Sequence, residues 1–207
     1  RRFMENKSPT KDVRLLMETD SGCDPEVWRQ LSGDLGLTAI HIPEGYGGQG
    51  FGVSELAIAV EEMGRVLLCA PYFASTVLAA TVILKAGSEA QKLALLPGIA
   101  SGKTIAAFAF TEASGRWDPG SVTVTATPAG GKYRLDGTKS FARAGHTADL
   151  IVVLARRPGS KGADGLSLFT VQGNATGIRR QRLETMDPTR KLARIEVQSA
   201  LTSEGVE

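Results

Sequence analysis

Segment 108–118 combines residue types that could bind a flat, polar cofactor. It leaves a predicted strand and enters a loop, and it carries two phenylalanine rings, the Thr111 hydroxyl and the Trp117 indole. Aromatic faces stack on planar rings, while a hydroxyl and exposed loop N–H groups can bind polar edges or a charged tail. These residue types suit a flat heteroaromatic ligand with a charged tail, and a structural turn is the alternative.

Metal and hydrolytic chemistry has little support among the residue types. Cys23 and Cys69 form no CxxC spacing, and His41 and His146 are far apart in the sequence. We therefore predict no metal site and no hydrolytic triad. His41 lies between two isoleucines, so we expect a packed or hydrogen-bonded histidine.

The charge pattern does not indicate nucleic-acid binding. The formal net charge is only +2, and the later basic residues are not interleaved with aromatic ones. We interpret these basic residues as a solvated strand face, with an anionic cofactor or a subunit contact as the alternative. They are Arg156, Arg157, Lys161, Arg179, Arg180, Arg182, Arg190, Lys191 and Arg194.

No membrane segment is predicted. The longest aliphatic run, residues 77–84, is far shorter than the roughly 20 residues that a spanning helix needs. No secretory leader opens the chain, and two unrelated cysteines suit a reducing compartment. We therefore predict a cytoplasmic protein without a membrane partner.

The first hundred residues show the helical period, because apolar side chains recur every three or four positions. Asp24 should cap the second of five predicted helices, which should bury Trp28 and Leu35. Ser54 should cap the third helix, and Ser88 opens a capping box for the fifth.

From Thr104 onward the pattern alternates with period two, and β-branched and aromatic residues are frequent, as in strands. Helices followed by strands predict an α+β fold. We expect an all-α N-terminal domain over residues 1–102 and an antiparallel β-barrel or sandwich over residues 103–207. The candidate strands lie near residues 104–110, 121–127, 132–140, 149–155, 166–171, 178–183 and 192–197.

Four segments, in this order and spacing, resemble the acyl-CoA dehydrogenase family. They are IPEGYGG at 42–48, EEMG at 61–64, FTE at 110–112 with Asp118 further on, and LDGTKSF at 135–141 followed by Ala148 and Asp149. The resemblance covers essentially the whole chain. Segments 117–119 and 186–190 further resemble an actinobacterial branch associated with steroid side chains and often assembled from two unlike subunits.

This resemblance implies an FAD-dependent oxidoreductase of lipid metabolism. In the family, a carboxylate removes the α-proton of an acyl thioester and FAD accepts a hydride from the β-carbon. The implied partners are an acyl-CoA substrate and an electron-transfer flavoprotein or similar acceptor. A homo- or hetero-oligomer is expected, with neither nucleic acid nor membrane.

The resemblance also assigns cofactor-contacting residues. Phe108, Phe110 and Thr111 fall where the first strand of the family's β-domain touches the isoalloxazine, with Thr111 at its polar edge. Phe141 falls where the family has an aromatic residue, usually tryptophan, packed on the flavin, and Ala142 follows it.

Three assigned positions depart from the family pattern. Arg116 and Trp117 stand where a glycine and a serine usually approach the FAD phosphate and the acyl-CoA. Arg143 stands where a threonine commonly reaches flavin N5. Arg143 could hold negative charge on the flavin or pair with a phosphate. Alternatively, it points to solvent in a subunit that binds FAD poorly or not at all.

On the substrate side, Trp117 and Ser75 are the expected binding residues. Small side chains around Ser75 should leave room for a branched or polycyclic acyl group. The family's base usually comes from a C-terminal helical domain, which we expect to be missing from residues 1–207, so no catalytic residue is assigned. The chain is then a fragment of a longer enzyme or a subunit that works with another chain.

Two other functions stay open. One is a non-catalytic partner subunit of a heteromeric acyl-CoA dehydrogenase, which the departures at Arg116, Trp117 and Arg143 favour. The other is a flavin oxidase or monooxygenase of the same superfamily, because a fold does not fix a reaction.

Overall fold

The computed structural model describes residues 1–202 and 205–206, which form two compact units. The first unit comprises Arg1–Ile105 and Glu184–Lys191, and the second comprises Ala106–Leu183 and the chain from Leu192 onward. The first unit is helical and the second is a sheet, so the predicted order of an all-α part and a β part is confirmed.

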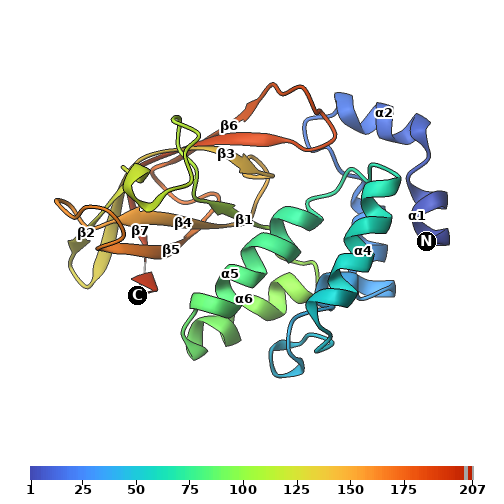
Figure 1. Cartoon of the computed structure of the whole chain (residues 1–207), viewed down its shortest axis with the longest axis horizontal. Helices are drawn as coiled ribbons and strands as arrows, with labels where there is room; N and C mark the ends of the chain where they lie inside the picture. Colours follow the sequence, from blue (N-terminus) through green and yellow to red (C-terminus); the bar gives the residue numbers. More distant parts are fainter. Residues whose placement is uncertain (203–204, 207) are drawn as a thin grey trace. The chain divides into compact units, whose positions relative to one another are not determined.

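The helical unit contains α-helices together with short 3-10 helices and π-helices. Helices α5 and α6 lie side by side in Figure 1. The elements are α1 (Arg2–Lys7), α2 (Thr10–Glu18), α3 (Pro25–Arg29), the π-helix η1 (Gln30–Asp34), the 3-10 helices η2 (Leu37–Ala39) and η3 (Glu44–Tyr46), α4 (Val53–Arg65), the π-helix η4 (Phe73–Ala79), α5 (Ala80–Ala86) and α6 (Glu89–Ala100).

Side-chain caps fix two of the predicted helix starts. The carboxylate of Asp24 accepts hydrogen bonds from the first turn of α3, and the Ser88 capping box precedes α6, as predicted. The predicted Ser54 cap of α4 is wrong. The cap residue is Gly52, whose N–H donates to the Glu55 carboxylate at 2.8 Å. This bond gives the Gly52 N–H a partner, and the cap residue lies two positions earlier than predicted.

Apolar side chains from several helices form the core of this unit. Trp28, Leu31 and Tyr72 are all buried in it. The prediction that Leu35 is buried is wrong, because it is 41% exposed. It follows the π-helix η1, whose wider turn rotates the next side chain off the buried stripe.

The segment Glu184–Lys191 joins two strands of the sheet but belongs to the helical unit. The Lys191 ammonium donates to the carbonyl of Met17, and Lys191 is buried. Arg190 lines a small cavity with residues of α4 and η4. This segment is therefore an integral part of the first unit.

The second unit is an eight-stranded sheet in the order β6-β7-β3-β2-β4-β5-β8, with β1 paired to β4. Its strands are β1 (Ala106–Ala109), β2 (Thr125–Ala129), β3 (Lys132–Arg143), β4 (Leu150–Arg156), β5 (Leu166–Gln172), β6 (Ile178–Leu183), β7 (Leu192–Thr202) and β8 (Gly205–Val206), and the short 3-10 helix η5 (Pro119–Ser121) lies between β1 and β2.

The sheet is mixed, which corrects the expectation of a purely antiparallel one. β1 and β2 both pair with β4 in parallel, whereas the other pairs are antiparallel. A parallel neighbour requires a crossover, and the chain from β1 to β4 makes it through β2 and β3. Inward-facing residues such as Ile151, Phe169 and Ile195 form the core.

Candidate functional site

The first half of the site is an aromatic row at the end of β1. Ala107 and Ala109 are buried, whereas the alternating Phe108 and Phe110 are only partly covered. Their rings stack with centroids 5.0 Å apart, and the Trp117 ring meets Phe110 edge-on at 5.5 Å. Trp117 is 80% exposed. These three residues, here called the aromatic row, present ring surface at the junction of β1 and its loop.

The second half is a bulge near the end of β3. The register with β7 shifts between Lys139 and Ala142, so β3 carries one residue more than its partner there. Phe141 sits in this bulge with a φ of 60°, a conformation that bulky residues rarely adopt, and its side chain is 45% exposed. Ala142 is buried, and Arg143 is exposed.

One backbone hydrogen bond joins the two halves. The Ser140 N–H donates to the Thr111 carbonyl at 2.9 Å, so the stretch that ends at Thr111 runs beside the bulge that carries Phe141. The Thr111 side chain is almost completely buried. The structure thus places side by side the two stretches to which the resemblance assigned cofactor contacts.

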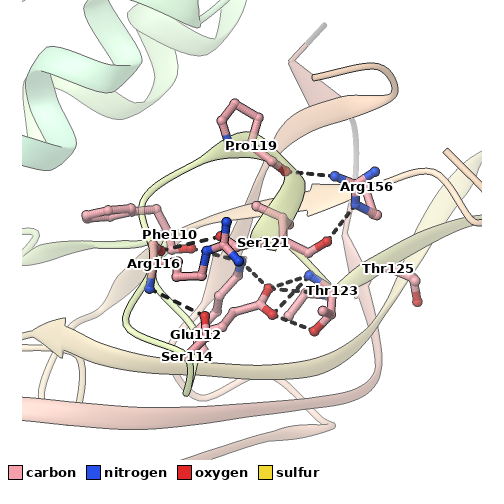
Figure 2. A network of polar contacts seen from close by, with 12 residues as sticks. Phe110, Glu112, Ser114, Arg116, Pro119, Ser121, Thr123, Thr125 and Arg156 are labelled. Carbon is pink, nitrogen blue, oxygen red and sulfur yellow. Dashed lines mark hydrogen bonds and ion pairs between the residues drawn. The ribbon is translucent and has the colours of Figure 1, made fainter. Parts of the chain in front are cut away.

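A buried ion pair lies directly behind this junction. The Lys139 ammonium is 2.8 Å from the Glu112 carboxylate, and the two side chains are 0% and 7% exposed. Lys139 also donates to the Phe110 carbonyl at 3.1 Å. The Glu112 carboxylate accepts from the backbone N–H groups of Thr123 and Val124 and from the Thr123 hydroxyl (Figure 2).

Burial and hydrogen bonding oppose each other in this pair. Burial alone would raise the pKa of Glu112, but the bonds from Lys139, Thr123 and Val124 outweigh it, so the pKa lies below its usual value. Burial lowers the pKa of Lys139, and the bond to Glu112 only partly offsets this effect.

Arg156 fixes the far end of the loop. Its guanidinium is buried and donates to the carbonyls of Val122 at 2.6 Å and Pro119 at 2.8 Å, and also to those of Ser160 and Gly162. Figure 2 shows Arg156 directed at Pro119, while Glu112 points toward Thr123. Two buried charged side chains therefore hold the loop between β1 and β2.

The exposed part of this loop carries a separate ion pair. Arg116 Nε lies 2.8 Å from a carboxylate oxygen of Asp118, and the two side chains are 69% and 44% exposed. Arg116 thus already has an acidic neighbour within the loop.

The interpretation of the late basic residues as one solvated strand face is wrong for two of them. Arg156 and Lys191 are buried and bind backbone carbonyls. Arg179 and Arg194 are exposed on β6 and β7, and Arg180 is partly buried and donates to the Ala148 carbonyl at 2.7 Å. These residues border a concavity of about 450 Å³. Its lining residues are Arg179, Arg180, Gln181, Arg194 and Glu196.

The predicted substrate residue Ser75 belongs to the helical unit. It is completely buried in the π-helix η4. A cavity of about 50 Å³ in the same unit is lined by Tyr72 and Phe73 together with residues of α4. The role of Ser75 stays a prediction.

Other chemistry finds few candidates in the part of the chain that the structure describes. No group of three or more His, Cys, Asp or Glu residues between positions 1 and 202 is arranged to hold a metal ion. His41 is partly buried, with Nε2 3.3 Å from the Thr81 hydroxyl, as expected for a packed histidine. Among the described residues, no helix has the length and apolar character needed to cross a membrane.

Comparison with known families decides the assignment. The family described as "Acyl-CoA dehydrogenase, N-terminal domain" matches residues 1–103, and "Acyl-CoA dehydrogenase, middle domain" matches residues 107–200. The chain belongs to the acyl-CoA dehydrogenase family. The aromatic row, the bulge and the ion pair behind them all lie within the family's middle domain.

Individual members of the acyl-CoA dehydrogenase family are similar over long stretches. An acyl-CoA dehydrogenase of Bacillus subtilis (strain 168) is 37% identical over 148 residues, which are 70% of this chain and 39% of that protein. The solved Tcur3481-Tcur3483 steroid ACAD is 29% identical, with a TM-score of 0.86 over 99% of this chain and 54% of that one.

The ChsE4-ChsE5 complex from Mycobacterium tuberculosis is 27% identical, with the same TM-score, 99% coverage of this chain and 54% of that one. The structural relatives thus include a steroid acyl-CoA dehydrogenase, as the resemblance predicted. The chain spans about half the length of these solved chains.

Sequence reasoning missed the residues that support the site. Glu112, Lys139 and Arg156 were not assigned to it, yet they fix its loop and its two strands. A signal was present for Lys139, because it stands in the same inward phase of β3 as Leu135, where a charged side chain needs a buried partner. For Arg156 the preceding apolar run gave no indication of its backbone partners.

Proposed function

We propose that this chain forms the FAD-contacting and acyl-CoA-facing part of an acyl-CoA dehydrogenase that desaturates an acyl thioester between its α- and β-carbons. The observation that carries the proposal is the junction of the aromatic row with the Phe141 bulge, joined by the 2.9 Å bond between Ser140 and Thr111. It lies within a chain that belongs to the family over both units. Bound FAD would supply the hydride acceptor.

The residues at this junction fit a flat aromatic cofactor. Phe141 is held outward by the backbone, and Phe108 and Phe110 keep part of their ring surface open. The buried Glu112 carboxylate is already paired with Lys139. A negatively charged ligand would therefore not meet an uncompensated buried carboxylate at this edge.

Each assigned residue would have a distinct task. Phe141 and Phe110 would orient the ring, and Thr111 would meet its polar edge with backbone or hydroxyl groups. Arg143 would favour negative charge near the ring, because a guanidinium is always protonated. Trp117 would cover the acyl-CoA side and limit access of water. We assign no base to this chain.

We propose a bulky acyl group, such as a steroid side chain, as the substrate, and a second, unlike subunit as partner. Similarity to the Tcur3481-Tcur3483 steroid ACAD and to the ChsE4-ChsE5 complex supports both. The proposed electron acceptor is an electron-transfer flavoprotein or a similar carrier. A linear acyl-CoA that bound more tightly than a branched or polycyclic one of similar carbon count would contradict the substrate class.

A second candidate is a partner subunit that does not itself react. It is favoured by the bond of Arg116 to Asp118 and by the exposed Trp117, which stand where the resemblance leads us to expect a small loop near phosphate. In that case the junction would complete a site whose reacting groups belong to another chain.

Anaerobic titration of the full-length protein with an acyl-CoA, followed in the visible spectrum, separates these functions. We expect bound flavin that is bleached by the acyl-CoA and reoxidised slowly when air is admitted. Fast reoxidation would indicate an oxidase or monooxygenase instead. Flavin that is not bleached, or absent, would indicate the partner subunit.

The site assignment itself is tested by flavin content. Thr111→Ala and Arg143→Ala should each lower the FAD bound per chain, while Arg179→Ala, an exposed arginine on β6, should not. Unchanged flavin content in both site variants would remove the assignment.

A further inference from the structure

Lys139 and Ser140 together hold three consecutive residues of the neighbouring stretch. The Lys139 ammonium donates to the Phe110 carbonyl at 3.1 Å and to the Glu112 carboxylate at 2.8 Å. The Ser140 N–H donates to the Thr111 carbonyl at 2.9 Å. Residues 110, 111 and 112 are thus each fixed to β3, although about thirty positions separate the two stretches in the sequence.

The same ion pair closes the loop that carries Trp117. Glu112 stands at its start and binds the N–H groups of Thr123 and Val124, at 2.9 Å and 3.0 Å, at its end. The Glu112 carboxylate therefore links the start of the loop to its end. The Trp117 ring, in turn, contacts Phe110 beside that carboxylate.

The bulge sets the directions of the residues that follow Lys139. Lys139 and Ser140 are both buried, although neighbouring strand residues normally face opposite sides. Lys139 keeps the inward phase of Leu135, and the extra residue that follows resets the alternation, so that Phe141 points outward with its φ of 60°. The bulge thus places an outward ring two residues after an inward charge.

We propose that the Lys139–Glu112 pair is a positioning device that locks residues 110–112 against the bulge and thereby sets the relative placement of Phe110, Phe141 and Trp117 for the flavin ring. The inference rests on the proposed function, since it names what orients that site. The pair acts through other residues and does not touch the reacting atoms.

A double variant, Glu112→Gln with Lys139→Met, tests this role. Replacing both members of a buried ion pair by neutral side chains of similar size is often tolerated, because no unpaired charge is left behind. We expect folded protein whose FAD dissociation constant, measured by quenching of flavin fluorescence, rises about tenfold or more. The visible bands of the bound flavin should shift toward those of free FAD.

Arg134→Met provides the matched control. Arg134 pairs with Asp136 at 3.2 Å on the same strand, but the two side chains are 49% and 43% exposed. We expect this variant to keep the dissociation constant and the spectrum of the parent protein. A folded double variant with the same dissociation constant and spectrum as the parent would overturn the positioning role.

If the double variant does not fold, Thr123→Val removes one donor to Glu112 and leaves both charges in place. It should raise the FAD dissociation constant by a smaller factor, about threefold. An unchanged dissociation constant for this variant would overturn the inference as well.

A flavin-free measurement separates failure of this inference from failure of the proposed function. The near-UV circular dichroism of Trp117, obtained by subtracting the spectrum of Trp117→Phe, reports how firmly the loop is held. If the parent protein binds no FAD, the proposed function fails. Even then, loss of this signal in the double variant would support the positioning role of the Lys139–Glu112 pair, and an unchanged signal would contradict it.

Discussion

The helices of the first unit and the strands of the second bury different kinds of polar group. Apart from Lys191, the helical unit buries mainly hydroxyl groups that donate to backbone carbonyls, such as Thr38 to Ala100 at 2.7 Å and Ser32 to Trp28 at 2.9 Å. The sheet takes in charged side chains, Glu112, Lys139 and Arg156 in particular. Because a buried charge costs far more when its partner is lost, the effects of single substitutions should be uneven between the two units.

This contrast follows the chemistry of the two regions. In the helical unit, the buried hydrogen bonds lie at the edges of an apolar core, and the packing of many apolar side chains stabilises that core. In the sheet, a few charged groups hold the loop between β1 and β2 and tie residues 110 and 112 to β3. Shape at the candidate site therefore depends on a small number of long-range contacts, and each can be tested.

The largest effect is expected for Glu112→Gln. At neutral pH it leaves the buried Lys139 ammonium without its counter-ion, and we expect the free energy of unfolding to fall by about 3–5 kcal/mol. Urea unfolding followed by far-UV circular dichroism measures the change.

The same substitution has a predicted pH dependence. The folded-state pKa of Glu112 lies below its reference value of 4.5, so the carboxylate stabilises the fold above that pH. This contribution is lost as the pH falls through the folded-state pKa. The difference between the parent and Glu112→Gln should therefore shrink in acid. Glu196→Gln, on the outer face of β7, is the control, and a difference that grows in acid would contradict the argument.

Arg156→Met is expected to come next. It removes the donor shared by the carbonyls of Pro119, Val122, Ser160 and Gly162, and we expect a loss of about 3 kcal/mol in unfolding free energy. The adjacent Arg157 is exposed, so Arg157→Met is a close control. Equal losses for the two variants would show that the buried contacts do not carry the effect.

A smaller effect is expected in the helical unit for Thr38→Val. This substitution removes the buried hydroxyl that donates to the Ala100 carbonyl, and we expect the free energy of unfolding to fall by about 1.5 kcal/mol. Thr19 makes the same kind of bond to Leu16 at 2.8 Å, but in solvent. Thr19→Val should change the unfolding free energy by less than about 0.5 kcal/mol. A cost for Thr38→Val above that of Arg156→Met would reverse the contrast between the units.

The smallest effect is expected for Ser88→Ala, which removes the N-cap of α6. Loss of such a cap costs about 1 kcal/mol. Ser54→Ala should be nearly neutral, because Gly52 and Glu55 form the start of α4. Thermal unfolding of the two variants side by side would test this, and a larger loss for Ser54→Ala would contradict the observed helix start.

Local chemistry made much of the fold predictable. The caps at Asp24 and Ser88 and the alternating strands follow rules that act within a few residues, and the structure confirms them. The errors arise where the backbone departs from those rules. Leu35 follows a π-helix, and the parallel pairing of β1 with β4 depends on a crossover that no local pattern encodes.

The candidate site was predictable in part. The residues of the aromatic row and Phe141 were selected from their types and from the family resemblance, and the structure places their stretches side by side. The supporting charges were not assigned, because Lys139 and Glu112 are far apart in the sequence and no local pattern shows that they pair. Whether the site holds flavin stays a prediction for the experiments above.

The excursion of Glu184–Lys191 into the helical unit has a practical consequence for dissecting the protein. The backbone crosses between the two units three times, so no single cleavage can yield both of them whole. A fragment ending at Ile105 would lack the segment Glu184–Lys191, and with it the hydrogen bond from Lys191 to the Met17 carbonyl. A protease nick after residue 105 should accordingly leave the two pieces associated until a denaturant releases them.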